Sequence, residues 1–129
     1  MNKKTIISLK LLFILIFSCI GWSTLQNNPF VFQRDNQKVV LEIENGKEYL
    51  IGDIKAKLKL KTENINPQKL SLSAPGLRLL LGANDNNNES LWEILPKKQN
   101  IKNDTLILSV VGRDLKDSIW VHKFKILVK

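Results

Sequence analysis

The chain has 129 residues, 43% of them apolar, with 20 basic and 12 acidic side chains. This apolar content is enough for the core of one domain, and the moderate positive charge does not by itself indicate binding to nucleic acid. The single cysteine excludes an intrachain disulfide, and the single histidine is too few for a tight transition-metal site. We therefore expect one domain that is stabilised by its core and has no cofactor.

Residues 1–22 have the organisation of an export signal, in which a basic start precedes an apolar segment over 11–20. Counted to Trp22, the segment has about 12 residues, whereas a helix that crosses the hydrocarbon core needs about 20. We predict a signal that is removed, which leaves 17 basic and 12 acidic residues and a net charge of +5. An uncleaved anchor that extends back through Lys10 to Ile6 is the alternative.

Cys19 lies at the end of this apolar segment. Residues 16–19, Ile-Phe-Ser-Cys, resemble a bacterial lipoprotein box, with an aliphatic residue three positions before the cysteine and a small one directly before it. We predict lipidation at Cys19, which would hold the protein at a membrane. The alternative is cleavage after Gly21 or Ser23 by an ordinary signal peptidase, in which case Cys19 is lost with the peptide.

Residues 23–37 are mostly polar and contain Pro29, so we predict a tether before a domain at residues 38–129. Phe30, Val31 and Phe32 interrupt this polar composition. The alternative is that they form a first edge strand, which docks on the domain.

From Val39 onward, apolar and polar residues alternate with a period of two, which is typical of strands. Residues 39–44 predict a strand, Asn45-Gly46 a tight hairpin, and 49–51 the returning strand. Residues 54–61 alternate aliphatic side chains with lysines and give the clearest half-buried strand.

The later strands are short and separated by turns. A near-continuous apolar run at 105–111 predicts a strand that is buried on both faces or central in its sheet. The remaining predicted strands are 70–72 and 77–81, which flank the turn Ala74-Pro75-Gly76, then 90–95 and 119–129. Seven or eight such strands predict an all-β fold, an immunoglobulin-like two-sheet sandwich without the usual cysteine pair.

Catalytic chemistry finds little support in the sequence. His122 alternates with Trp120 and Phe124, which predicts a partly exposed histidine at the edge of the core rather than a catalytic base. The Gly-x-Ser-x-Gly motif is absent. We expect the glutamates to be solvated strand positions rather than an acid/base pair; they are Glu42, Glu44, Glu48 and Glu93.

Two surface features have competing interpretations. Lys55, Lys57, Lys59 and Lys61 predict a basic ladder about 20 Å long on one sheet face. The ladder either meets an acidic glycan or lipid head groups or, as we favour, protects an edge strand from pairing. Residues 84–89 have the composition of a calcium loop without its acidic spacing, so we expect a solvated loop.

Four segments carry a family resemblance: Tyr-Leu-Ile-Gly-Asp at 49–53, Lys-Leu-Ser-Leu-Ser at 69–73, Trp-Glu-Ile-Leu-Pro at 92–96 and Phe-Lys-Ile-Leu-Val at 124–128. In this order they resemble the periplasmic immunoglobulin-like domains of the gliding-motility protein GldM, which builds the shaft of the type IX secretion machinery in Bacteroidetes. The resemblance implies an exported, protein-contacting domain of this type. The front of the chain departs from that family, which has a longer anchor and tandem domains.

We therefore expect a non-enzymatic binding or structural module of the bacterial cell envelope, periplasmic or associated with the outer membrane as a lipoprotein. Its expected partner is another envelope protein, and the resemblance relates it to gliding and type IX secretion. The alternative is a glycan-binding accessory domain in which an exposed Trp92 stacks on sugar rings. Exposure of Trp92 and Trp120 distinguishes the two functions.

Overall fold

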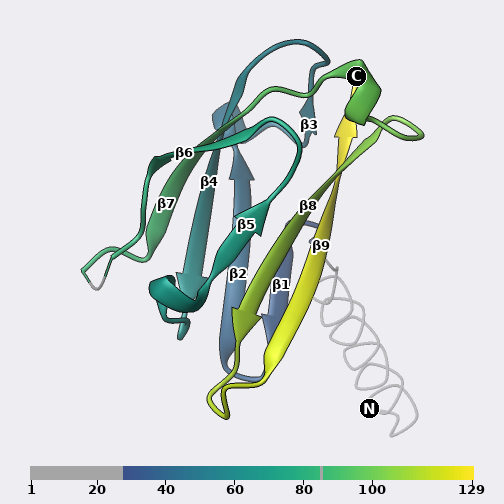
Figure 1. The fold of residues 1–129 in the computed structure, drawn as a ribbon. Helices are drawn as coiled ribbons and strands as arrows, with labels where there is room; N and C mark the ends of the chain where they lie inside the picture. Colours follow the sequence, from purple (N-terminus) through teal and green to yellow (C-terminus); the bar gives the residue numbers. More distant parts are fainter. Residues whose placement is uncertain (1–27, 85) are drawn as a thin grey trace, which may run out of the picture.

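Period-two alternation builds nine strands in the part of the chain that this computed structural model describes, residues 28–84 and 86–129 (Figure 1). In chain order they are β1 (Val31–Arg34), β2 (Gln37–Ile43), β3 (Tyr49–Leu50), β4 (Ala56–Glu63), β5 (Ser71–Ser73), β6 (Leu77–Leu81), β7 (Glu89–Ile94), β8 (Thr105–Arg113) and β9 (Ile119–Val128). Only short 3-10 turns, and no α-helix, occur in these described residues.

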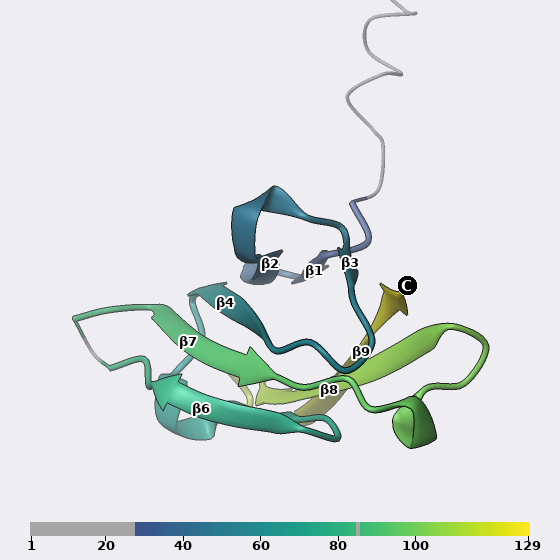
Figure 2. The ribbon, with the colours of Figure 1, turned by 90° about the horizontal axis from the view of Figure 1, so that it is seen from above.

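The strands form two sheets. One has five strands in the order β1-β2-β4-β7-β6, and the other has four in the order β3-β9-β8-β5. Neighbouring strands are antiparallel except β3, which runs parallel to β9. Figure 2 shows the five-stranded sheet curving from β1 and β2 through β4 and β7 to β6, with β8 and β9 in the other layer.

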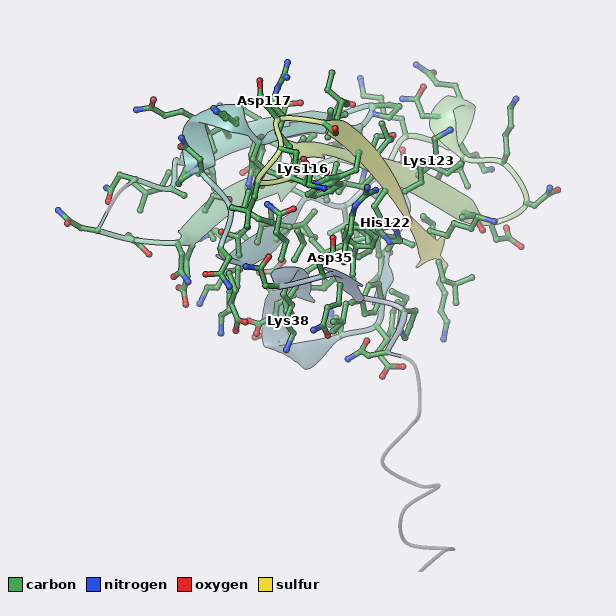
Figure 3. The ribbon with its side chains drawn as sticks, turned by 90° about the horizontal axis from the view of Figure 1, so that it is seen from below. Asp35, Lys38, Lys116, Asp117, His122 and Lys123 are labelled. Atoms are coloured by element: carbon green, nitrogen blue, oxygen red, sulfur yellow. The ribbon has the colours of Figure 1, made fainter. Side chains whose placement is uncertain are left out.

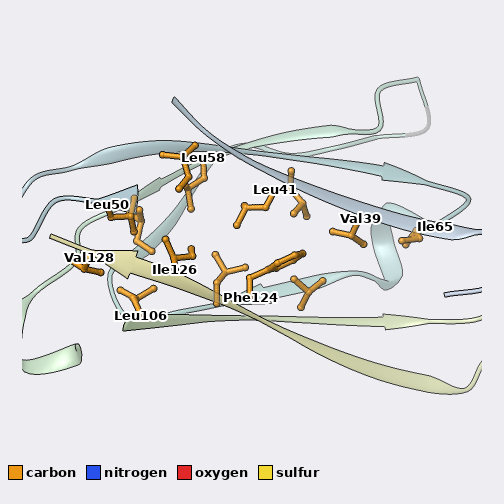
Figure 4. Packing of buried hydrophobic residues seen from close by; sticks show 14 of the residues in the cluster. Val39, Leu41, Leu50, Leu58, Ile65, Leu106, Phe124, Ile126 and Val128 are labelled. Carbon is orange, nitrogen blue, oxygen red and sulfur yellow. The ribbon is translucent and has the colours of Figure 1, made fainter. Parts of the chain in front are cut away.

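The core lies between the two sheets, and both contribute alternate side chains to it (Figure 4). Phe124 of β9, for example, is 1% exposed. The other buried apolar residues are Val39, Leu41, Ile43, Leu50, Leu58, Leu60, Ile65, Ile94, Leu106, Leu108, Val110, Trp120, Ile126 and Val128. The predicted all-β, two-sheet architecture is confirmed.

The tight hairpin predicted at Asn45-Gly46 is wrong. Both residues have the positive φ that such a turn requires, 61° and 66°. The segment Glu44–Gly46 is nevertheless a 3-10 turn, and the next strand, β3, pairs with β9 of the opposite sheet. In this position Leu50 of β3 is buried in the core.

β4 corrects one interpretation of the lysine ladder. Leu58 and Leu60 are buried as predicted, whereas Ile54 precedes the strand and is exposed. β4 lies between β2 and β7, in the interior of the five-stranded sheet. The favoured explanation of the lysines as protection for an edge strand is therefore wrong.

β8 lies between β9 and β5, which confirms its predicted central position. Burial on both faces, the other possibility, does not occur. Leu106, Leu108 and Val110 are buried, whereas Ile107 between them faces outward and is exposed. A continuous apolar run therefore does not distinguish two buried faces from an apolar outer surface.

The described part of the predicted tether belongs to the fold. β1 pairs with β2 at the edge of the five-stranded sheet, and Phe32 packs against the core. Val31 and Phe32 of the apolar triplet thus begin a docked edge strand, which was the alternative, and Phe30 lies just before it. The predicted signal over 1–22, lipidation at Cys19 and the rest of the tether lie outside the described residues.

Candidate functional site

β6 is an outer strand of the five-stranded sheet with an apolar edge. It pairs with β7 on one side, and no strand in the described ranges pairs with its other side. Leu79, Leu80 and Leu81 are all exposed, the last at 60%. The register shifts between Leu79 and Leu81, so they lie opposite Trp92 and Leu91 respectively. Unpaired backbone beside exposed leucines is a template for another strand.

The opposite edge strand of this sheet, β1, carries polar and charged side chains, which protect an edge from pairing with another chain. β1 carries exposed Gln33 and Arg34, and the guanidinium of Arg34 lies 3.8 Å from the carboxylate of Asp114. The one charge on β6 is Arg78, whose Nη2 lies 3.5 Å from Oε1 of Glu93 on the adjacent strand. Leu79, Leu80 and Leu81 follow Arg78 without a further charge, so the apolar stretch of this strand carries no charge of its own.

A cavity of about 200 Å³ lies between the sheets beside this edge. Leu79 of β6, Trp92 of β7 and Leu72 of β5 line it, together with Leu60, which is buried in the core. None of its lining residues is charged; the others are Thr62, Pro67, Leu70, Gly82, Ala83, Asn88 and Ser90. It is smaller than the roughly 300 Å³ at which small-molecule sites begin, so it suits an inserted side chain better than a separate ligand.

Trp92 presents an apolar wall to this cavity because its polar atom is already bonded. The indole Nε1 donates a hydrogen bond to Oγ of Ser90 at 2.8 Å. An apolar side chain that enters the cavity would therefore leave no donor of this indole unpaired.

The leucines of β6 were not predicted as a site from the sequence. The available signal was Leu79-Leu80-Leu81 itself, because three successive apolar residues break the alternation of a half-buried strand. The structure explains the break by the register irregularity, which leaves all three side chains exposed.

The lysine ladder lies on the outer face of the five-stranded sheet, between glutamates of both neighbouring strands. Lys61 Nζ is 3.1 Å from Oε1 of Glu42 and 3.8 Å from Oε1 of Glu89, and Lys59 Nζ is 3.9 Å from Oε2 of Glu89. The hydrogen bond with Glu42 raises the pKa of Lys61 above its usual value. The positive charge of the ladder is thus largely balanced, which weakens it as a site for acidic glycans or lipids.

Three of the four glutamates that were predicted to be solvated make contacts, Glu42 and Glu93 with lysine side chains and Glu44 with backbone. Glu42 and Glu93 lie on opposite sides of β4, about 10 Å apart at the usual strand spacing. Glu93 Oε1 is 3.9 Å from Nζ of Lys55, and Glu44 Oε1 accepts a hydrogen bond from the backbone of Lys57 at 3.1 Å. Glu48 is exposed. The structure does not bring these carboxylates together around a common cleft.

A shallow depression of about 600 Å³ also lies on this face, beside the loop after β2. Its lining includes Phe30 and Val40 but also charges of both signs, such as Glu44 and Lys57. This mixture selects no one class of ligand.

The outer face of the four-stranded sheet has different chemistry. β5, β8 and β9 contain no aspartate or glutamate. Lys123 and Lys125 project from β9, and neither makes an ion pair within the described part of the chain. Four aliphatic side chains on the same face are exposed: Ile107, Ile119, Val121 and Leu127.

His122 lies on the other side of β9, between that strand and the β1–β2 hairpin (Figure 3). Its ring stacks on Phe32 at 4.3 Å between centroids and meets the edge of Phe124 at 4.6 Å. Burial lowers the pKa of His122 below its usual value. It is half-buried among aromatic rings, which confirms its predicted place at the edge of the core.

The two tryptophans do not offer the flat exposed pair on which the glycan alternative depends. Trp120 is 3% exposed, and its Nε1 donates a hydrogen bond to Oε1 of Gln37 at 3.1 Å. Trp92 is partly buried against the core. This outcome removes the main argument for sugar stacking in the described domain.

The asparagine-rich loop before β7 is exposed, as predicted for a solvated loop. Oδ1 of Asn84 accepts a hydrogen bond from the backbone N–H of Asn86 at 2.9 Å, and Oδ1 of Asn87 accepts one from Glu89 at 3.0 Å. These oxygens therefore bind local backbone. No cluster of three or more metal-ligating side chains occurs in residues 28–84 and 86–129.

Comparison of the chain with family models, curated proteins and solved structures gave no match. Among the residues that the structure describes, no helix has the length and apolar character needed to cross a membrane.

Proposed function

We propose that this chain is a non-enzymatic binding module of the bacterial cell envelope, which contacts another envelope protein through the edge of β6. One observation carries the proposal: three exposed leucines lie on a strand edge that no other described strand pairs with, beside an uncharged cavity between the sheets. Strand addition uses such an edge, because main-chain hydrogen bonds supply affinity and pockets for alternate side chains supply specificity.

The partner in this proposal is an extended, apolar segment of a protein. Its backbone pairs with the free side of β6, and one large apolar side chain enters the cavity between Leu79 and Trp92. Burial of apolar surface contributes about 25 cal/mol per Å². A charged side chain at that position would be excluded, because the cavity lining provides no opposite charge.

A second copy of the chain suits this edge less well. β6 has five residues, and pairing two such strands would bury far less than the roughly 1,200 Å² at which stable protein interfaces begin. A longer partner segment that also fills the cavity supplies the additional contact.

We also propose an immunoglobulin-like type for the sandwich. In support, β2-β4-β7-β6 corresponds to the A-B-E-D order of that fold, and β9-β8-β5 corresponds to its G-F-C order. β1 would then be an additional edge strand. The N-terminal sequence pattern supports attachment to a membrane through lipid on Cys19 or an uncleaved anchor. The link to gliding and type IX secretion rests on the sequence resemblance.

Site-specific photocrosslinking of the full chain in its native membrane tests the contact at β6. A photoreactive residue at Leu80 should give one defined crosslinked protein, whereas the same residue at Gln33, on the opposite edge of the sheet, should not. Leu79→Lys should reduce the crosslink from position 80 at least tenfold, because a charge next to the cavity opposes apolar insertion. Gln33→Lys is the matched control and should leave it unchanged.

Two results would contradict the proposal. One is equal crosslinking from positions 80 and 33, which would show no preference for the β6 edge. The other is specific binding on a glycan array by a chain that yields no crosslinked protein, which would favour the glycan-binding alternative.

A further inference from the structure

The outer face of the four-stranded sheet is not used by the protein contact at β6. Along β9, this face presents Ile119, Val121, Lys123, Lys125 and Leu127 in succession, with a span of about 27 Å at 3.4 Å per residue. Its residues alternate with the buried ones and are exposed. The strip therefore has aliphatic ends and a basic middle.

The neighbouring strand β8 continues the same pattern. Ile107 lies opposite Lys125, Ser109 opposite Lys123, and Val111 opposite Val121. The polar residue beside Lys123 is thus a neutral serine, and no strand residue of β5, β8 or β9 is a carboxylate. The two lysines consequently keep their charge available to an external partner.

The two outer faces of the domain differ in this respect. On the five-stranded sheet, glutamates flank the lysines of β4 and bind them. On the four-stranded sheet, positive charge and exposed aliphatic side chains lie together without acidic partners on the strands. A surface of this kind attracts a partner in which negatively charged groups lie next to an apolar region.

We propose that the outer face of the four-stranded sheet rests on an anionic phospholipid surface. Lys123 and Lys125 meet phosphate head groups, and the aliphatic side chains at both ends of the strip enter the interface. The complementarity is that of basic and apolar side chains with anionic lipids. The inference is independent of the contact at β6, which involves the other sheet.

The chain that precedes the domain favours a bilayer over an acidic protein. Residues 20–27 separate the predicted lipid site Cys19 from Asn28, and eight extended residues reach at most about 28 Å. The inference rests on the membrane attachment proposed above, because lipid on Cys19 would keep the domain next to a membrane at high effective concentration. Two lysines attract an anionic surface only weakly, which suffices for a tethered face but not for capture of a free acidic protein.

Lysine footprinting of the full chain in vesicles tests the inference. The chain is reconstituted through its own N-terminal segment into vesicles of phosphatidylcholine alone or of equal parts phosphatidylcholine and phosphatidylglycerol. Acetylation of each lysine is then measured by mass spectrometry. Lys123 and Lys125 should react on the order of 3-fold more slowly in the anionic vesicles, and high salt should remove the difference. Lys57, on the opposite face, is the internal control and should react equally in both.

A matched pair of variants separates the face from general membrane proximity. Val121→Asp places a negative charge within the strip and should abolish the protection of Lys123. Ile54→Asp alters a side chain of equal exposure outside the strip, 55% against 56%, and should leave the protection intact. Circular dichroism checks that both variants keep the β fold.

Equal reactivity of Lys123, Lys125 and Lys57 in both kinds of vesicle would overturn the inference. Protection that appears only when membrane proteins are added, irrespective of the lipid, would also overturn it and would assign the face to an acidic protein.

Discussion

At Gly112, β8 passes close to the indole ring of Trp120, its partner on β9. A Cβ atom at this position would lie 2.7 Å from Cε2 of Trp120 and 2.8 Å from Cη2. The ring has little freedom to move, because its Nε1 is bonded to Gln37, which itself donates to the carbonyl of Arg113 at 2.8 Å. Glycine at position 112 therefore allows the Trp120 ring to pack directly against the backbone of β8.

We predict that Gly112→Ala lowers the free energy of unfolding by about 1–3 kcal/mol, the usual cost of overpacking a core. Gly82→Ala is the control, since a Cβ atom added at Gly82 would have Cδ2 of Leu79 as its nearest neighbour at 3.8 Å, an ordinary contact. Urea denaturation of both variants measures the difference. An equal loss in the two would show that the Trp120 ring accommodates the methyl group.

Sequence patterns predicted individual buried side chains best where alternation was strict. Leu58, Leu60 and Phe124 are buried as the pattern indicated. Gln37, only 4% exposed, was assigned to the tether because it is polar and follows a polar stretch. Its burial depends on hydrogen bonds to Arg113 and Trp120, 76 and 83 positions away, which no local pattern reveals.

At the scale of elements, β1 shows how a short edge strand is held. It pairs with β2 over four positions, and Phe32 lies 5.0 Å from the ring of Trp120 and 4.3 Å from that of His122. The aromatic contacts join β1 of one sheet to β9 of the other. Phe32 therefore stabilises one side of the sandwich as well as its own strand.

We predict that Phe32→Ala lowers the free energy of unfolding by about 1–3 kcal/mol and increases amide hydrogen exchange in Val31–Arg34 more than in β8. Gln33→Ala, on the same strand with an exposed side chain, should change neither. Hydrogen-exchange mass spectrometry measures both effects. Unchanged exchange in β1 of Phe32→Ala would mean that the backbone pairing alone holds the strand.

Positions of strands could be predicted from the sequence, but their neighbours could not. Period-two alternation located β4, β7 and β9, because it reports which side chains face the core. It does not report which strand lies beside which. The turn at Asn45-Gly46 and the lysines of β4 therefore suggested a hairpin and an edge strand, whereas the chain crosses between sheets and β4 is internal. The β6 site was missed for the same reason, since its open edge follows from the strand order.

At the scale of the whole molecule, charge is segregated between the two faces. Composition predicted the net charge but not this distribution, because the pairing of lysines with glutamates depends on the register of β2, β4 and β7. Because glutamates pair with the lysines on the outer face of the five-stranded sheet, the excess positive charge lies on the other surfaces of the domain. The attachment of the domain to a membrane remains a prediction from the N-terminal sequence.

We predict that the mature chain begins at Cys19 and carries lipid. Its intact mass should equal that of residues 19–129 plus a thioether-linked diacylglyceryl group and an amide-linked acyl chain, and Cys19→Ala should carry no diacylglyceryl group because the thioether needs the thiol. Intact mass spectrometry of the membrane fraction makes the measurement. A mature chain that starts after Gly21 or Ser23 would contradict lipidation and support release of a free domain.

The position of β9 in the chain has a consequence for the timing of folding. β9 pairs with β8, joins β3 of residues 49–50 and supplies Trp120 to Gln37, 83 positions earlier. Contacts between such distant positions slow folding to milliseconds or seconds, and β3 has no strand to pair with until β9 has emerged. The second sheet therefore stays incomplete until β9 is available, and a chain that has not yet closed its sandwich is the form that can pass through a narrow translocation pore.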